Sequence, residues 1–201
     1  GDAKRLAVAE YFFKQVFEYV TIDQMGLGTD GGFFTDGSFI QHENIPYTGS
    51  YGNGFLYAIT QYAYLLKDCP FGLYFETANN QFQWALNNYR PVIFGANLSA
   101  SLLGRSVTSA TEGFTAMESI RAAMIMSTYA PEKYKADLLQ FVKTVMVEAN
   151  SMFLRYMPLQ FMELAYSIFN DASILPQTDY HIGKVFGYMD RVAQHNDGYG
   201  V

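Results

Sequence analysis

Residues 36–52 read DGSFIQHENIPYTGSYG and lie within a stretch, residues 26–54, that is rich in glycine and lacks helical periodicity. The sequence therefore predicts a long loop here, and a loop of that length in a compact domain is usually functional. It carries His42, Tyr47 and Tyr51. Neighbouring glycines let the backbone fold tightly enough for one of these rings to approach a ligand.

Apolar residues spaced three and four positions apart predict amphipathic helices on both sides of this loop. Ser109 and Glu112 fit a capping box at the start of one helix, and Pro131 suits the first position of the next. Connections between the helices are mostly short, which favours antiparallel neighbours. The predicted helices cover about residues 5–20, 55–66, 76–88, 109–129, 131–150 and 159–169.

The pattern changes after Asp171. Residues 183–193 show no helical stripe, and the Asn-Asp-Gly sequence at residues 196–198 is a turn signal. We therefore expect the first strands of a β domain at this end. The expected division separates a helical part, residues 1–175, from a linker and the start of the β domain, residues 176–201.

Composition limits the class of protein. Half of the chain is hydrophobic and 16% is charged, which predicts a folded domain. The formal net charge of −6 argues against a nucleic-acid partner, which would need a face of lysine and arginine. No apolar run approaches the ~20 residues of a membrane span, so no membrane partner is expected. The single cysteine, Cys69, excludes an intrachain disulfide and a cysteine-based metal cluster, and we expect its thiol to be buried.

A lone histidine in a loop is more often structural than catalytic, but nearby tyrosines give His42 a chemical context. A tyrosine–histidine pair suits removal of a proton α to a carboxylate, followed by loss of the β-substituent. The C5 proton of a uronic acid is removable only if the carboxylate is neutralised as the carbanion develops. A tyrosine base, with an ordinary pKa near ~10, needs cationic or hydrogen-bonding neighbours. The residue types alone are compatible with this chemistry.

The loop resembles that of the family 8 polysaccharide lyases, the hyaluronate, chondroitin AC and xanthan lyases, where a DGSF-x-QH…Y-T-G-x-Y-G pattern carries a catalytic histidine and tyrosine. By that resemblance Tyr51 is the base that removes the C5 proton and the acid that protonates the leaving oxygen. His42 would assist at the carboxylate and help to keep Tyr51 ionised, and Tyr47 would be structural. The matching residues are Asp36, Gly37, Ser38, Phe39, Gln41, His42, Tyr47, Thr48, Gly49, Tyr51 and Gly52.

A second likeness lies in residues 104–109, GRSVTS, because the family has a Gly-Arg-Ser stretch with another arginine four residues after the first. Arg105 matches the first arginine, which would stabilise the tyrosinate and the leaving group. The alternative interpretation of Arg105 is a salt bridge at a helix end. Ser109 stands where the second arginine is expected, which removes one positive charge from the site.

The resemblance also implies a fold and a setting. The fold would be mainly α, part of an (α/α) toroid of antiparallel helix hairpins, with the first strands of a C-terminal β-sandwich at the end. Residues 183–193 are similar to the stretch that leads into that sandwich, and the nearby His181 and His195 are expected to be structural. The implied substrate is an acidic polysaccharide and the implied location is extracellular or periplasmic. Neither a cofactor nor a catalytic metal is implied.

By the same resemblance, a carboxylate-neutralising asparagine is expected before residue 1 and an acidic residue of the β domain after residue 201, so we expect the isolated chain to be inactive. Two other functions stay open. A non-catalytic carbohydrate-binding module that retains the lyase fold is favoured by the serine at position 109 and the acidic balance. A glycoside hydrolase would need paired carboxylates, for which Asp30 and Asp36 are the candidates in the loop.

Overall fold

The chain is mainly helical over the part that the structure describes. This computed structural model describes residues 2–21, 31–69, 75–108, 115–150, 152–155, 157–178, 181–196 and 198–200. Its α-helices are α1 (Ala3–Gln15), α2 (Asn53–Leu66), α3 (Asn80–Trp84), α4 (Met117–Met126), α5 (Glu132–Glu148), α6 (Met152–Arg155) and α7 (Met162–Asn170).

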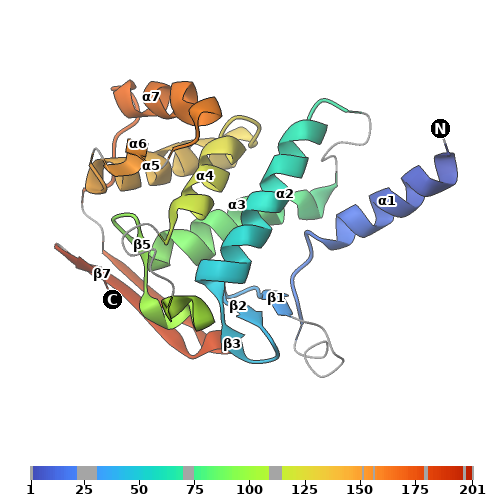
Figure 1. Cartoon of the computed structure of the whole chain (residues 1–201), viewed down its shortest axis with the longest axis horizontal. Helices are drawn as coiled ribbons and strands as arrows, with labels where there is room; N and C mark the ends of the chain where they lie inside the picture. Colours follow the sequence, from blue (N-terminus) through green and yellow to red (C-terminus); the bar gives the residue numbers. More distant parts are fainter. Residues whose placement is uncertain are drawn as a thin grey trace.

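Four of these helices pack against one another in turn. Helix α2 packs on α4, α4 on α5 and α5 on α7, while α1 projects away at the end of the molecule that carries the N-terminus (Figure 1). Buried apolar residues of α4 and α5 fill the centre of this group, as the apolar spacing requires. The mainly helical fold predicted from the sequence is confirmed.

One of the predicted helices is not continuous, and the predicted start of another lies outside the described residues. The segment predicted as one helix over residues 76–88 is a 3₁₀ turn η3 (Glu76–Asn79), then α3, then a π-helical turn η4 (Ala85–Tyr89). The prediction of one continuous helix was therefore wrong, because spacing alone does not distinguish these helix types. The predicted capping box falls on Ser109 and Glu112, which lie outside the described residues.

The prediction of a long structureless loop over residues 26–54 was also wrong for the part that is described, because three short antiparallel strands occupy it. They are β1 (Gly31–Phe33), β2 (Phe39–Gln41) and β3 (Ile45–Pro46), followed by a π-helical turn η2 (Thr48–Gly52) that continues into α2. Strands of two or three residues are too short to show a period of two.

Buried aromatic rings hold this small sheet on the helices. The Phe33 ring stacks on the Trp84 indole with 4.5 Å between centroids and 11° between planes. It also lies 4.8 Å from the Phe39 ring and 6.1 Å from the rings of Phe55 and Tyr89. Phe33 and Trp84 are each 1% exposed. The sheet is therefore fixed to α3 and α2 by packing rather than by backbone pairing.

The C-terminal strands form an antiparallel sheet, as the sequence predicted, and they are β6 (Ile182–Phe186), β7 (Arg191–Asn196) and β8 (Tyr199–Gly200). The ring of His195 on β7 is buried, and its Nε2 lies 2.7 Å from the carbonyl oxygen of Pro91. On the turn between β6 and β7, the Tyr188 N–H donates to the Asp36 carboxylate at 3.1 Å. These contacts attach the C-terminal sheet to the helical part.

The remaining short elements connect the larger ones. The hairpin of β4 and β5 leads into two 3₁₀ turns that lie beside η2. The short elements are η5 (Arg90–Val92), β4 (Ile93–Phe94), β5 (Asn97–Leu98), η6 (Ala100–Leu102), η7 (Gly104–Thr108), η8 (Leu159–Phe161) and η9 (Gly187–Met189).

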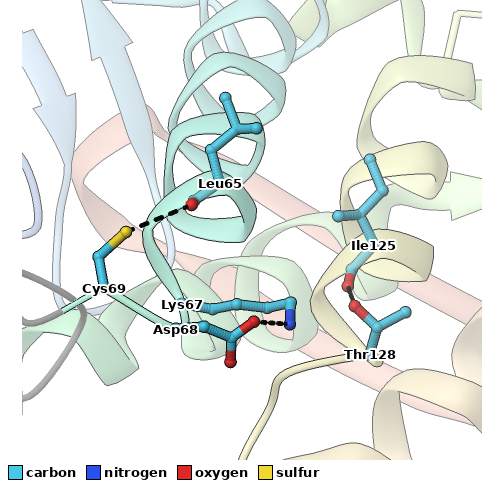
Figure 2. Close-up of polar contacts among 6 residues, drawn as sticks. All are labelled: Leu65, Lys67, Asp68, Cys69, Ile125 and Thr128. Atoms are coloured by element: carbon cyan, nitrogen blue, oxygen red, sulfur yellow. Dashed lines mark hydrogen bonds and ion pairs between the residues drawn. The ribbon is translucent and has the colours of Figure 1, made fainter.

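Cys69 corrects a further prediction. Its thiol was expected to be buried, but the residue is only partly buried at the end of α2, where Sγ contacts the Leu65 carbonyl oxygen at 3.9 Å (Figure 2). Lys67 and Asp68 form an ion pair beside it. Because the chain is polar at this end of the helix, the thiol is not packed into the core.

Across the described ranges, no helix is both long enough and apolar enough to cross a membrane.

Replacing Phe33 tests the role of the aromatic cluster. We expect Phe33→Ala to lower the free energy of unfolding by about 3–5 kcal/mol, because it removes a buried ring and leaves a cavity. Tyr11→Ala on α1, where the side chain is 61% exposed, should change it by less than about 0.5 kcal/mol. Urea unfolding of the full-length variants measures both, and equal effects would contradict the assigned role.

His195 should make stability depend on pH. Burial lowers its pKa below the usual 6.5, partly offset by the Pro91 carbonyl. The unfolded chain therefore binds a proton below about pH 6.5 that the folded chain does not. The His195 ring does not reduce the free energy of unfolding above that pH, and reduces it progressively as the pH decreases below about 6.5. His195→Gln should reduce the loss of melting temperature between pH 7.5 and about 5. Equal pH dependence in the variant and the wild type would refute this.

Candidate functional site

Three rings from the predicted loop converge at one place. The His42 ring lies 5.3 Å from the Tyr51 ring, nearly perpendicular to it, and 6.2 Å from the Tyr47 ring. The two tyrosine rings lie 4.9 Å apart. The structure thus brings together the histidine and the tyrosine that the sequence predicted as a catalytic pair.

The turn between β2 and β3 presents His42. The residue has a φ of 52° and the following Glu43 a φ of 70°, both in the left-handed region that residues other than glycine seldom adopt. The turn is closed by the Asn44 N–H, which donates to the His42 carbonyl oxygen at 2.9 Å. Such backbone conformations cluster at functional sites, where the surrounding structure enforces them.

Tyr51 sits in η2, at the start of α2, and is 44% exposed. The buried Asn53 fixes this turn, since its Nδ2 donates to the Gly49 carbonyl oxygen at 3.1 Å and to the Thr115 carbonyl oxygen at 2.7 Å. The second contact joins the turn to the residues before α4. A π-helical turn of this kind is often found at functional sites. The phenol is therefore accessible while its backbone is held.

Arg105 reaches the site through Tyr47. Its backbone N–H donates to the Tyr47 hydroxyl at 3.0 Å, and its Nε donates to the same oxygen at 3.3 Å. The hydrogen bond from Arg105 lowers the pKa of Tyr47, although burial opposes the shift. The pKa of Arg105 is raised, chiefly by the hydrogen bond to Tyr47, with a contribution from Tyr51. These contacts are to phenols and not to a carboxylate at a helix end.

The contact between Tyr47 and Arg105 was missed by the sequence reasoning, which treated Tyr47 as structural. The two residues are 58 positions apart, so no local spacing signals their contact. The only sequence signal was the occurrence of Tyr47 in the same short pattern as Tyr51. The structure therefore adds a fourth side chain to the predicted group of His42, Tyr51 and Arg105.

A hollow of about 320 Å³ opens beside Tyr51. Buried aromatic rings form part of its wall, and polar side chains from the end of α1 and from β2 form another part. Phe33 and Trp84 are almost fully buried, so the polar side chains and the exposed Tyr51 form most of the surface that a ligand could contact. The lining includes Gln15, Glu18, Phe33, Gln41, Tyr51, Phe55 and Trp84.

Asp36 has a structural place. Its carboxylate accepts hydrogen bonds from the Ser38 N–H at 2.8 Å, the Ser38 hydroxyl at 3.0 Å and the Tyr188 N–H at 3.1 Å. Asp30, the other carboxylate considered for hydrolysis, lies outside the described residues. Within the part of the chain that is described, no group of three histidine, cysteine or acidic side chains is arranged to hold a metal ion. The arrangement favours proton transfer by an exposed phenol.

Comparison with a family model gives a match over residues 1–144, to "Polysaccharide lyase family 8, N terminal alpha-helical domain". Among curated proteins, the chain is 29% identical over 205 residues to a xanthan lyase of Bacillus sp. (strain GL1), covering 100% of this chain and 21% of that protein. It is 29% identical over 191 residues to a hyaluronate lyase of Staphylococcus aureus, covering 92% and 23%. The chain thus spans about a fifth of the length of these relatives.

Solved structures share the fold. A Paenibacillus xanthan lyase superposes with a TM-score of 0.86 at 23% identity, over 99% of this chain and 19% of that one. A Streptomyces coelicolor chondroitin AC lyase, in complex with chondroitin sulphate, superposes with a TM-score of 0.82 at 19% identity, over 96% and 27%. These likenesses confirm the predicted fold, part of an (α/α) toroid.

Gly104 tests the fit of the Arg105 turn against Tyr47. Its φ is +53°, and an added Cβ would lie 1.8 Å from Cε2 of the Tyr47 ring. Gly95 has a similar φ of +60° but open space around it. Gly95→Ala should therefore cost only the backbone strain, about 1–2 kcal/mol, and Gly104→Ala a further ~1–3 kcal/mol of overpacking. Chemical unfolding compares them, and equal losses would contradict the close contact.

Proposed function

Since the chain belongs to polysaccharide lyase family 8, we propose that the full-length protein cleaves a uronate-containing polysaccharide by β-elimination. The observation that carries the proposal is the placement of an exposed Tyr51 phenol 5.3 Å from the His42 ring, measured between centroids. A base for a carbon-bound proton must be accessible and yet held in position. Tyr51 meets both conditions.

Tyr51, as a tyrosinate, would remove the proton at C5 of the uronate. The electron pair left on C5 forms the C4–C5 double bond as the C4–O4 bond breaks. The Tyr51 hydroxyl then returns the proton to the leaving oxygen, so that no water is consumed and the phenol is ready for another cycle. One residue serves as base and acid because both reacting atoms lie on adjacent carbons of the same sugar.

His42 and Arg105 would supply the electrostatic support. Charge accumulates on the uronate carboxylate as C5 loses its proton, and donors aimed at that charge lower the barrier. His42 would assist at the carboxylate. The Arg105 guanidinium stays charged at any working pH and would stabilise the tyrosinate and the leaving oxygen. Because the chain carries a net charge of −6, the positive field that an acidic polymer needs must be local to this site.

The proposed substrate is a polymer of the hyaluronan, chondroitin or xanthan type, and we place the protein outside the cell or in the periplasm, where such polymers occur. The relatives named as xanthan and hyaluronate lyases support this substrate class. We also propose a domain boundary that separates residues 1–175 from residues 176–201. It is supported by the end of α7 at Asn170 and the start of β6 at Ile182.

A non-catalytic carbohydrate-binding protein with the same fold is the second candidate. It is favoured by the net negative charge and by Ser109, where the family resemblance leads one to expect arginine. The proximity of His42 and Tyr51 favours the lyase, since binding alone does not require an exposed phenol beside an imidazole. The two functions differ in whether turnover exists at all.

A lyase assay on a panel of uronate polymers tests the proposal. The full-length protein should raise the ultraviolet absorbance of a 4,5-unsaturated uronate, and Tyr51→Phe should lower kcat by roughly 10²–10⁴-fold with little loss of affinity. Tyr62→Phe, at a tyrosine of α2 that is 61% exposed, serves as the matched control and should keep full activity. Binding without turnover would favour the second candidate, and chain cleavage without the absorbance rise would exclude β-elimination.

A further inference from the structure

Tyr47 has no role in the mechanism above, although its ring lies at the centre of the site. The residue is 2% exposed, and its ring lies 4.9 Å from that of Tyr51 and 6.2 Å from that of His42. A phenol buried in this way does not reach a polymer that lies over the exposed Tyr51. Its hydroxyl must therefore act on neighbouring side chains.

The Tyr47 hydroxyl contacts Arg105 at two points. The backbone N–H of Arg105 donates to it at 3.0 Å and the side-chain Nε at 3.3 Å. The first contact holds the backbone from which the arginine side chain extends, and the second holds one atom of the guanidinium, Nε. An arginine side chain carries roughly 2 kcal/mol of rotamer entropy. An arginine side chain that is held at Nε, on a backbone that is held as well, has lost part of this freedom before the substrate arrives.

Two glycines allow this contact. A Cβ at Gly104 would lie 1.8 Å from the Tyr47 ring, and a Cβ at Gly49 would lie 2.3 Å from Cδ2 of Leu103. The η2 and η7 segments therefore approach each other more closely than side chains at these positions would permit. The arginine turn sits directly on the phenol, so the contact results from the backbone arrangement and not from a chance rotamer.

Charge links the same groups. The hydrogen bond from Arg105 lowers the pKa of Tyr47, and the pKa of Arg105 is raised by Tyr47 and, to a smaller extent, by Tyr51. The guanidinium therefore lies within electrostatic reach of both phenols. Tyr47 holds it, and Tyr51 is the phenol that is exposed to a substrate.

We propose that Tyr47 is a positioning residue, whose buried hydroxyl holds the Arg105 guanidinium in the orientation that serves Tyr51. The inference rests on the proposed lyase function and adds to it a residue that acts on the reaction through Arg105 without touching the substrate.

The test removes the hydroxyl and keeps the ring. In the full-length protein, Tyr47→Phe should lower kcat by roughly 10- to 100-fold, as misplacement of a catalytic group does, with KM little changed. Tyr129→Phe is the control, because the partly buried Tyr129 hydroxyl donates to Oε1 of Gln81, at 2.7 Å, and not to Arg105 or to η2. The control should keep kcat within about threefold of the wild type.

A double-mutant cycle separates positioning from simple structural support. In an Arg105→Ala background, Tyr47→Phe should change kcat by less than about twofold, because the group that it positions is gone. The same fold-loss in both backgrounds would overturn the inference. Arg105→Lys keeps the charge but lacks the Nε contact, so full activity in that variant would overturn it as well, even if Tyr47→Phe failed to fold.

The two proposals fail in different ways. Unchanged kcat in Tyr47→Phe, together with an active wild type, would refute the positioning role and leave the lyase function intact. A wild type that yields no unsaturated product from any uronate polymer would refute the lyase function, and the positioning role with it.

Discussion

The stacking of Phe33 on Trp84 is the contact on which the site depends. It holds the sheet of β1, β2 and β3 against the helices. These strands are very short, so the sheet has few backbone hydrogen bonds of its own. The turn after β2 contains His42, and the chain continues through β3 into the π-helical turn that contains Tyr51. Fixing the sheet therefore fixes the place where the two rings meet. Apolar packing thus determines the geometry of polar groups several residues away, since a well-packed interior transmits small displacements.

The charges of the site are arranged locally within an acidic chain. Arg105 is exposed, but two contacts to Tyr47 hold it, and it lies within electrostatic reach of Tyr51. A buried phenol accepts hydrogen bonds from a guanidinium and leaves its positive charge in place, whereas a carboxylate would neutralise that charge. A carboxylate in the place of Tyr47 would leave little net attraction for an anionic sugar. The choice of partner therefore preserves the electrostatic field at the site.

The mainly helical fold was predicted correctly, because amphipathic spacing is a local signal, and the compact motif named residues that the structure brings together. His42 and Tyr51 are nine positions apart and were paired correctly in space, although their catalytic roles stay predictions. The contact of Tyr47 with Arg105 was not predictable, because it joins segments 58 positions apart. The short strands and the 3₁₀ and π turns were also missed, since too few residues form each to establish a period.

Asp36 joins the hairpin to the C-terminal sheet through a backbone donor, the N–H of Tyr188. No side-chain replacement at position 188, other than proline, removes that donor. The side chain at position 188 can therefore change while the hydrogen bond that joins the Asp36 turn to the C-terminal sheet is kept.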